Sequence, residues 1–189
     1  FGKALKNFLA SLEIRKDMED KQGIGTSYNN IGLIYTEQGN YDKALENYFV
    51  SLKIKEEIGD KQGIATSYNN IGIIYFNQNK IAKAKKQSLM SLNLAKDIGS
   101  KDDIKQAYQT LSLCDSATGN WKGAYQYHKL YSQIKDSIFN EENSKQIHEM
   151  SAKYESEKKE QQIKLLNAEK EKQAAITAEQ RKRLYIILG

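Results

Sequence analysis

The stretch KQGIGTSYNNIGLIY at residues 21–35 decides the fold, because it recurs as KQGIATSYNNIGIIY at residues 61–75. Thirteen of the fifteen positions are identical, at an offset of forty residues. A near copy at this period predicts an array of repeats, in which each unit stacks on its neighbours around a continuous core. Every unit of such an array presents equivalent side chains to one surface, so we expect the functional surface to be built from residues forty apart.

Each repeat unit is predicted to contain two amphipathic helices. In the unit at 21–60, apolar residues recur at spacings of three and four and form one stripe on the first helix: Ile24, Tyr28, Ile31, Ile34 and Tyr35. Gly39 ends that helix, because glycine accepts the left-handed conformation that a tight turn needs. The chain contains no proline and no long alternation of β-branched residues. The sequence therefore predicts an all-α fold without a sheet.

The composition fits an array joined to a solvated helix. Of the 189 residues, 39% are apolar, and the mean hydropathy of −0.72 is low for one compact globule. The net charge is +5, but charges of both signs are interspersed along the chain and form no basic stripe. Nucleic acid is therefore not expected as a partner.

The repeat unit resembles the tetratricopeptide repeat. In the unit at 21–60, the residues that carry the resemblance are Tyr28, Ile31, Gly32, Tyr35, Gly39, Asn40, Tyr41 and Ala44. In the next unit they are Tyr68, Ile71, Gly72, Tyr75, Asn79, Lys80, Ile81 and Ala84. The period of forty residues is longer than the usual one of about 34, as in the variant repeats of kinesin light chains and of bacterial peptide-sensing regulators. The resemblance implies a helix-turn-helix solenoid with a concave face that binds protein or peptide segments.

The expected organisation follows from this period and from the change in composition after residue 139. It comprises the second helix of a truncated first repeat at 1–20, repeats at 21–60 and 61–100, a degenerate or capping repeat at 101–139, a charged connector helix at 140–183 and the start of a transmembrane helix at 184–189. The repeat at 101–139 is degenerate because Ser112 and Asp115 replace the small Gly and the aromatic Tyr of the pattern.

Two asparagine pairs, Asn29-Asn30 and Asn69-Asn70, are the main candidate binding residues. Asparagine is a mediocre helix former, so two in a row within each repeated helix call for an explanation. The resemblance implies that Asn30 and Asn70 clamp the backbone of an extended peptide, since an amide offers both donors and acceptors. Two other interpretations stay open: an amide ladder between repeats, and inheritance with the duplicated unit.

The remaining candidates are predicted to share the concave face with the asparagines: Thr26, Leu33, Thr66, Ile73 and Gln106. We expect no catalytic residues, no metal site and no cofactor, and therefore no enzyme. Cys114 has no base near it in sequence and is predicted to be a buried structural thiol. His128 occupies the place of Tyr48 and is predicted to be a packed helix residue.

The segment 141–183 is predicted to be one long helix, because its 19 charges in 43 positions are mixed with good helix formers. Its interrupted apolar seam contains Ile147, Met150, Tyr154, Leu165, Leu166 and Ile176. This seam fails a strict heptad, so a single helix and a two-stranded coiled coil both stay open. A homodimer through this helix is accordingly a second expected partnership.

The last residues, RKRLYIILG at 181–189, are interpreted as the beginning of a membrane helix, with an apolar helix end as the alternative. Residues 135–166 resemble the connector of bacterial membrane signalling proteins common in Bacteroidetes, whose outputs include histidine kinases, transcription factors, cyclases and phosphatases. The resemblance implies a membrane-anchored sensor with its array outside the cytoplasmic membrane, in the periplasm. The basic residues 181–183 favour a cytoplasmic array instead. The rival function is a scaffold for self-association or complex assembly without ligand sensing.

Overall fold

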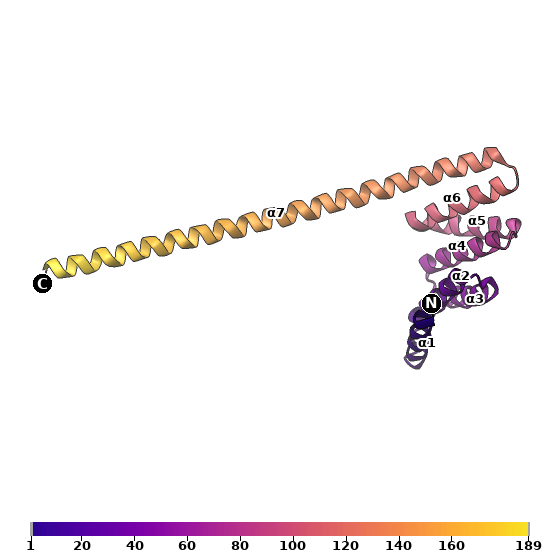
Figure 1. Ribbon diagram of the computed structural model, residues 1–189, viewed down its shortest axis with the longest axis horizontal. Coiled ribbons are helices and arrows are strands. Elements are labelled where there is room, and N and C mark those ends of the chain that lie inside the picture. Colours follow the sequence, from indigo (N-terminus) through magenta and orange to yellow (C-terminus); the bar gives the residue numbers. More distant parts are fainter. Residues whose placement is uncertain (1, 189) are drawn as a thin grey trace. The chain divides into compact units, whose positions relative to one another are not determined.

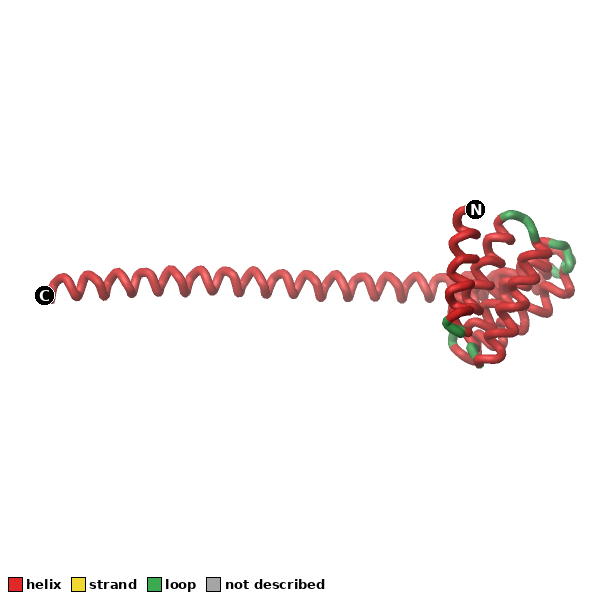
Figure 2. The backbone as a smooth tube through the Cα atoms, turned by 90° about the horizontal axis from the view of Figure 1, so that it is seen from below, coloured by secondary structure: helices red, strands yellow, loops and turns green. Residues whose placement is uncertain are grey.

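The computed structural model describes the backbone of residues 2–188 and the side-chain burial of residue 2 and residues 5–177. This described part contains helices and no strands, which confirms the all-α prediction. The helices are α1 (Gly2–Asp17), α2 (Lys21–Glu37), α3 (Tyr41–Ile58), α4 (Lys61–Asn77), α5 (Ile81–Ile98), α6 (Lys101–Ala117) and α7 (Trp121–Leu188) (Figure 1). Short loops join consecutive helices (Figure 2), and the long last helix was also predicted. Contacts divide the chain into two units, Phe1–Ile138 and Phe139–Gly189.

The helix ends of the first unit repeat every forty residues because the same caps recur. The side chains of Asp20 and Asp60 accept hydrogen bonds of 2.9 Å from the backbone N–H groups of Gly23 and Gly63. These bonds satisfy a donor that the first helical turn leaves unpaired. At the other end of the unit, Gly59 closes α3 with a φ of 71°, a left-handed conformation that glycine adopts at little cost.

The apolar core lies between successive repeats. One cluster joins α3 to α4 and contains Ala44, Tyr48, Leu52, Ile71 and Ile74. A second cluster joins α5 to α6 and contains Leu92, Ala107, Tyr108 and Leu111. Both clusters pair the second helix of one repeat with the first helix of the next. Stacking of neighbours therefore supplies the core, as expected of a repeat array.

Within a repeat, the two helices approach closely at a small residue. A Cβ atom at Gly32 would lie 2.7 Å from Cε1 of Tyr48, whose ring is buried. In the next repeat, Ser88 stands in the place of Tyr48, and a Cβ atom at Gly72 would lie 2.8 Å from its Oγ. A side chain at either glycine would force the two helices or their side chains to shift.

The second unit is the part of α7 from residue 139 onward, and it buries little of itself. All residues from 144 to 177 are exposed. Ion pairs at i,i+4 spacing join Lys145 to Glu149, Lys153 to Glu157 and Lys164 to Glu160, at 3.8, 4.0 and 2.6 Å. Such exposed pairs contribute little to stability, so good helix formers maintain this segment without a core of its own.

The predicted membrane-anchored location is wrong on the present structure. Over the residues that the structure describes, none of the helices combines the length and the apolar character needed to cross a bilayer. The physical reason in α7 is that Glu, Lys and Gln interrupt every apolar run of the segment 140–177. The expected periplasmic location depended on that anchor and loses its support. Side chains of the predicted membrane start at 184–189 lie outside the described residues.

Candidate functional site

The first helices of three repeats form the candidate binding surface, which we call the α2–α4–α6 face. Helix α4 contacts both α2 and α6, so equivalent residues of the three helices follow one another across the surface. The five candidates predicted beside the asparagines are all at least partly accessible to solvent on this face: Thr26, Leu33, Thr66, Ile73 and Gln106. They are available to a ligand, and ligand contact at these residues stays a prediction.

Asn29 and Asn70 form a hydrogen bond between repeats. The Nδ2 group of Asn70 donates to Oδ1 of Asn29 at 2.9 Å, and Asn70 is buried. This bond is one rung of the amide ladder that the sequence left open as an alternative to the peptide clamp. The donor of Asn70 is therefore already engaged within the array.

Asn69 also bonds between helices rather than facing solvent. It is fully buried, and its Nδ2 group donates to the backbone oxygen of Asp103 at 3.1 Å and to Oδ1 of Asp103 at 3.2 Å. Its own Oδ1 is buried and has no partner among the described residues. A ligand can reach Asn69 only if α4 and α6 separate.

Asn30 differs from the other three asparagines. It is half-buried on α2, and within the described part of the chain no hydrogen bond to its side chain is formed. Of the four asparagines, Asn30 is thus the one whose whole amide stays open to an external group. Peptide binding by these asparagines stays a prediction, and Asn30 is the member best placed for it.

Sequence reasoning missed Leu113, although the signal was available. Leu33 and Leu113 are 42% and 45% exposed, and Ile73 is half-buried between them. Leu113 stands forty residues after Ile73, which stands forty after Leu33. The α2–α4–α6 face therefore carries one apolar side chain per repeat at the same position.

Asp103 was also missed, because it replaces Gly63 of the preceding repeat and breaks the repeat pattern. Its buried carboxylate accepts from Oγ1 of Thr66 at 3.1 Å and from Oγ of Ser100 at 2.7 Å, in addition to Asn69. The amide of Gln62 donates to it as well. These donors stabilise a buried charge and fasten α6 to α4.

Cationic side chains, of which Arg15 is partly buried and Lys55 is buried, fasten the earlier junctions between repeats. Nη1 of Arg15 donates to the oxygen of Gly23 at 2.7 Å and to Oγ of Ser27 at 3.0 Å. One period later, Nζ of Lys55 donates to the oxygen of Gly63 and to Oγ of Ser67, both at 3.3 Å. Equivalent contacts forty residues apart show that these polar residues serve the stacking of the array.

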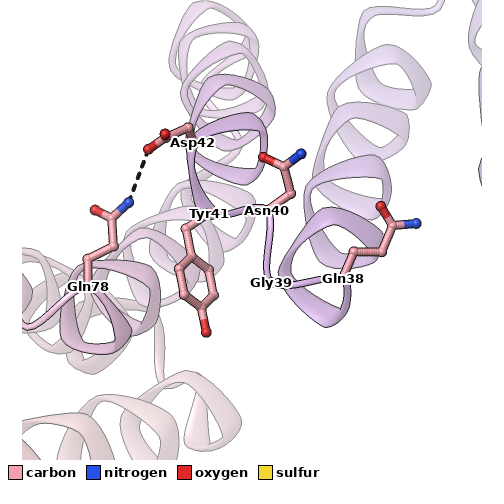
Figure 3. Close-up of a pocket in the computed structure, with 6 residues that line it drawn as sticks. All are labelled: Gln38, Gly39, Asn40, Tyr41, Asp42 and Gln78. Atoms are coloured by element: carbon pink, nitrogen blue, oxygen red, sulfur yellow. Dashed lines mark hydrogen bonds between the residues drawn. The ribbon is translucent and has the colours of Figure 1, made fainter.

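A separate open pocket of about 410 Å³ lies at the turns (Figure 3). It is lined by Gln38, Gly39, Asn40, Tyr41, Asp42 and Gln78. Nε2 of Gln78 donates to Oδ1 of Asp42 at 3.1 Å, and Oδ1 of Asn40 accepts from the N–H of Lys43 at 3.4 Å as the cap of α3. Its polar groups thus serve the turns, and none of the predicted binding residues lines it.

Cys114 and His128 are the two titratable residues that the sequence singled out beyond the repeat junctions. Cys114 is fully buried, as predicted, and burial raises the pKa of its thiol to about 11. His128 is exposed, and its ring centroid lies 5.9 Å from that of Tyr131, so the prediction of a packed residue was wrong. No group of three or more His, Cys, Asp or Glu within the described residues could hold a metal ion.

Comparisons with solved structures agree with this geometry. BtubC (BKLC) from P. vanneervenii matches 72% of the chain with a TM-score of 0.64 and 19% identity, over 57% of its own length. The TPR domain of Arabidopsis FLU matches 62% with a TM-score of 0.59 and 18% identity, over 98% of its length. At these identities the likeness concerns the fold alone.

A third structure is more similar in sequence. It is a signal transduction ATPase with numerous domains (STAND) protein with a tetratricopeptide repeat sensor from Pyrococcus horikoshii, 28% identical with a TM-score of 0.64 over 71% of the chain. The chain spans only 21% of that protein and just over half of BtubC. No curated protein matches the sequence.

Family models match the repeats directly. Residues 1–57 match one tetratricopeptide repeat model, and residues 64–96 match a second. The matched ranges include α1, α2 and most of α3, α4 and α5, and the apolar cluster between α3 and α4 is described above. These matches show that residues 1–57 and 64–96 are made of tetratricopeptide repeats, whose arrays are protein-interaction modules.

Proposed function

We propose that the array binds a segment of a partner protein on the α2–α4–α6 face and acts as the non-catalytic input module of a signalling protein. The observation that carries this proposal is the row formed by Leu33, Ile73 and Leu113. Apolar side chains that remain accessible at one position in three consecutive repeats gain free energy when a partner removes them from water.

The signalling part of the proposal draws on the similar STAND protein, whose tetratricopeptide repeats are described as a sensor. A ligand that favours one curvature of the array would shift the population toward that state. Helix α7 begins in the last repeat and continues to Leu188. A conformational change in the last repeat would therefore move the first turns of α7, and the helix continues without a break to Leu188.

The test compares one triple variant and one double variant of the full chain with the wild type in a peptide display experiment. Changing Leu33, Ile73 and Leu113 together to Gln should abolish the enrichment of peptides that bind the wild type. The control changes Phe49 and Val50 of α3 to Gln, since these residues are 43% and 41% exposed but lie outside the face. Equal loss in both variants, or unchanged binding by the triple variant, would contradict the proposal.

The second candidate function is self-association through α7, the scaffold alternative. The observation in its favour is a set of exposed apolar residues, between 42% and 70% accessible, along the second unit: Phe139, Ile147, Met150, Tyr154, Leu165 and Ile176. Tyr154, Leu165 and Ile176 are spaced by eleven residues. An eleven-residue period keeps a seam on one side of a nearly straight helix and suits a right-handed supercoil, which explains why the heptad fails.

Sedimentation of the full chain tests this candidate. The wild type should dimerise with rising concentration, and Leu165→Lys should shift it to monomer. Ile163→Lys is the matched control, because Ile163 is 58% exposed but lies about 200° around the helix from Leu165, at roughly 100° per residue. A wild type that stays monomeric throughout would remove this candidate.

A further inference from the structure

The exposed seam of α7 has a row of side chains on each side. The seam repeats every eleven residues, at Asn143, Tyr154, Leu165 and Ile176. This period corresponds to about 98° per residue, so a residue four positions after a seam residue lies about 33° to one side of the seam, and a residue four positions before lies about 33° to the other. The first row, which we call the first flank, contains Ile147, Lys158 and Glu169, and the second flank contains Met150, Gln161 and Lys172.

The side chains of both flanks are available to a second chain. All six are exposed. Lys158, Glu169 and Lys172 form no ion pair within the described chain, and the three i,i+4 ion pairs of this segment join other residues. The charges beside the seam are therefore not neutralised within their own helix.

The two flanks are complementary in a parallel pair of α7 helices. The two-fold axis of such a pair runs along the helices, so the first flank of one copy meets the second flank of the other. Each residue of the first flank is then closest to the residue three positions later in the second copy, about 4.5 Å further along the helix. The resulting contacts are Ile147 with Met150, Lys158 with Gln161, and Glu169 with Lys172. One contact is apolar, one is polar and one joins opposite charges.

An antiparallel pair lacks this match. Its two-fold axis is perpendicular to the helices, so each flank meets its own reversed copy. Ile147 is the single apolar residue of the first flank, and Met150 is the single apolar residue of the second. When the copies overlap along the whole seam, both residues face polar or charged side chains, and apolar surface is then covered by groups that prefer water.

The seam itself favours the same orientation and register. In a parallel pair without an offset, each seam residue meets its own copy, so Tyr154, Leu165 and Ile176 form apolar layers. Asn143, which is half-buried, meets a second Asn143, and two amides can each donate and accept. A single asparagine in the seam of a coiled coil specifies the register of the two helices.

We propose that α7 pairs with α7 of a second copy of this chain, in parallel and in register along residues 143–176. This inference rests on the self-association proposed above and deepens it by giving the orientation and the register. The seam supplies the apolar contact, and the flanks select the parallel arrangement because only there do apolar residues meet each other and opposite charges meet.

Disulfide cross-linking of the full chain tests the orientation. Tyr154→Cys and Ile176→Cys should each give a cross-linked homodimer on mild oxidation, because each seam residue meets its own copy. Ile163→Cys is the matched control, since Ile163 is 58% exposed but lies on another side of the helix. This control and the wild type, whose Cys114 is fully buried, should not cross-link.

Exchanging charges provides a second measurement that keeps the seam intact. Glu169→Lys and Lys172→Glu each set like charges against each other twice per dimer and should weaken the dimer by about tenfold. An equimolar mixture of the two variants should recover association as a heterodimer, because each chain supplies the charge that the other needs. Contacts within each helix are the same in the mixture as in the separate variants, so the recovery reports contacts between chains.

The outcomes separate the register from the self-association. Cross-links that form only between Tyr154→Cys and Ile176→Cys, or a charge mixture without recovery, would overturn the parallel register and leave pairing through α7 intact. Equal cross-linking of Ile163→Cys would overturn the defined seam. A wild type that sediments as a monomer at every concentration would overturn the register and the self-association together. Peptide binding on the α2–α4–α6 face is tested separately by the triple variant described above.

Discussion

Asn70 donates its side-chain amide to Asn29 across the first complete repeat junction, at 2.9 Å. The same side chain had been a candidate for holding a peptide backbone. Asn30, the equivalent residue of the preceding repeat, makes no such bond in the described chain. Of these two equivalent asparagines, Asn70 therefore has a structural role, whereas the side chain of Asn30 is free to bind another group.

Replacing Asn70 with Ala should lower the free energy of unfolding by about 1 kcal/mol, the net value of a typical hydrogen bond. Asn30→Ala should change it by less than about 0.5 kcal/mol, because an unbonded, half-buried amide is lost. Chemical denaturation of both variants beside the wild type measures the difference. Equal destabilisation by the two changes would contradict the distinction drawn between them.

Gly32→Ala should destabilise the array more than Gly72→Ala. The new methyl group at position 32 meets the buried ring of Tyr48 at 2.7 Å, and overpacking of this kind costs roughly 1–3 kcal/mol. At position 72 the close atom is Oγ of Ser88, which can rotate away. Thermal melting ranks the two variants. In a Tyr48→Ser background, which places the serine of the next repeat at position 48 and removes the ring, Gly32→Ala should add less destabilisation than it does in the wild type.

The helices and the stacking of repeats were predictable because they depend on patterns that one sequence displays directly. The near copy at residues 21–35 and 61–75 established the period, and apolar spacing identified both helices of each unit. Accessible residues such as Leu33 followed from the same periodicity. These features depend on local propensity and on contacts that every repeat shares.

Departures from the repeat were not predictable in the same way. Asp103 replaces a glycine, and its bonds to Thr66 and Asn69 join positions that are not equivalent in the two repeats. His128 was expected to pack because Tyr48 does. Its repeat has Ser112 in place of the glycine, with Oγ donating to the oxygen of Ala124 at 2.9 Å, so the space that receives the Tyr48 ring is not reproduced.

Lys55 should make stability depend on pH at alkaline values. Burial lowers the pKa of its amine below the ordinary value of 10.5, and the charges of Asp60 and Asp103 oppose that shift only in part. As the pH rises through the lowered pKa toward 10.5, the folded chain loses the proton before the unfolded chain does. The unfolded state then binds more protons, so stability rises with pH in this window.

The measurement of this pH dependence is the difference in free energy of unfolding between the wild type and Lys55→Met. As the pH rises from neutrality toward 10.5, the free energy of unfolding of the wild type should increase relative to that of Lys55→Met. Lys53→Met is the control, because Lys53 is exposed on the same helix. A difference for Lys55→Met that does not change with pH would mean that burial of its charge does not affect folding.

Thr110→Asn should stabilise the chain by completing the amide ladder. Position 110 follows Asn70 by forty residues, as Asn69 follows Asn29, so the new amide would be placed to donate to Oδ1 of Asn69 just as Asn70 donates to Asn29. That oxygen is buried and unpartnered in the described chain, and pairing it should contribute about 1 kcal/mol or more. Helix propensity is nearly unchanged, since Thr and Asn rank together.

A double-mutant cycle identifies the source of the gain from Thr110→Asn. Combined with Asn69→Ala, the change should lose its effect, because the acceptor is gone. Asn30→Ala provides the unrelated background in which the gain should persist. If Thr110→Asn stabilises both backgrounds equally, the new amide acts elsewhere. If it stabilises neither the wild type nor the Asn30 variant, the equivalence of the two junctions fails at this rung, and the unpaired oxygen of Asn69 requires another explanation.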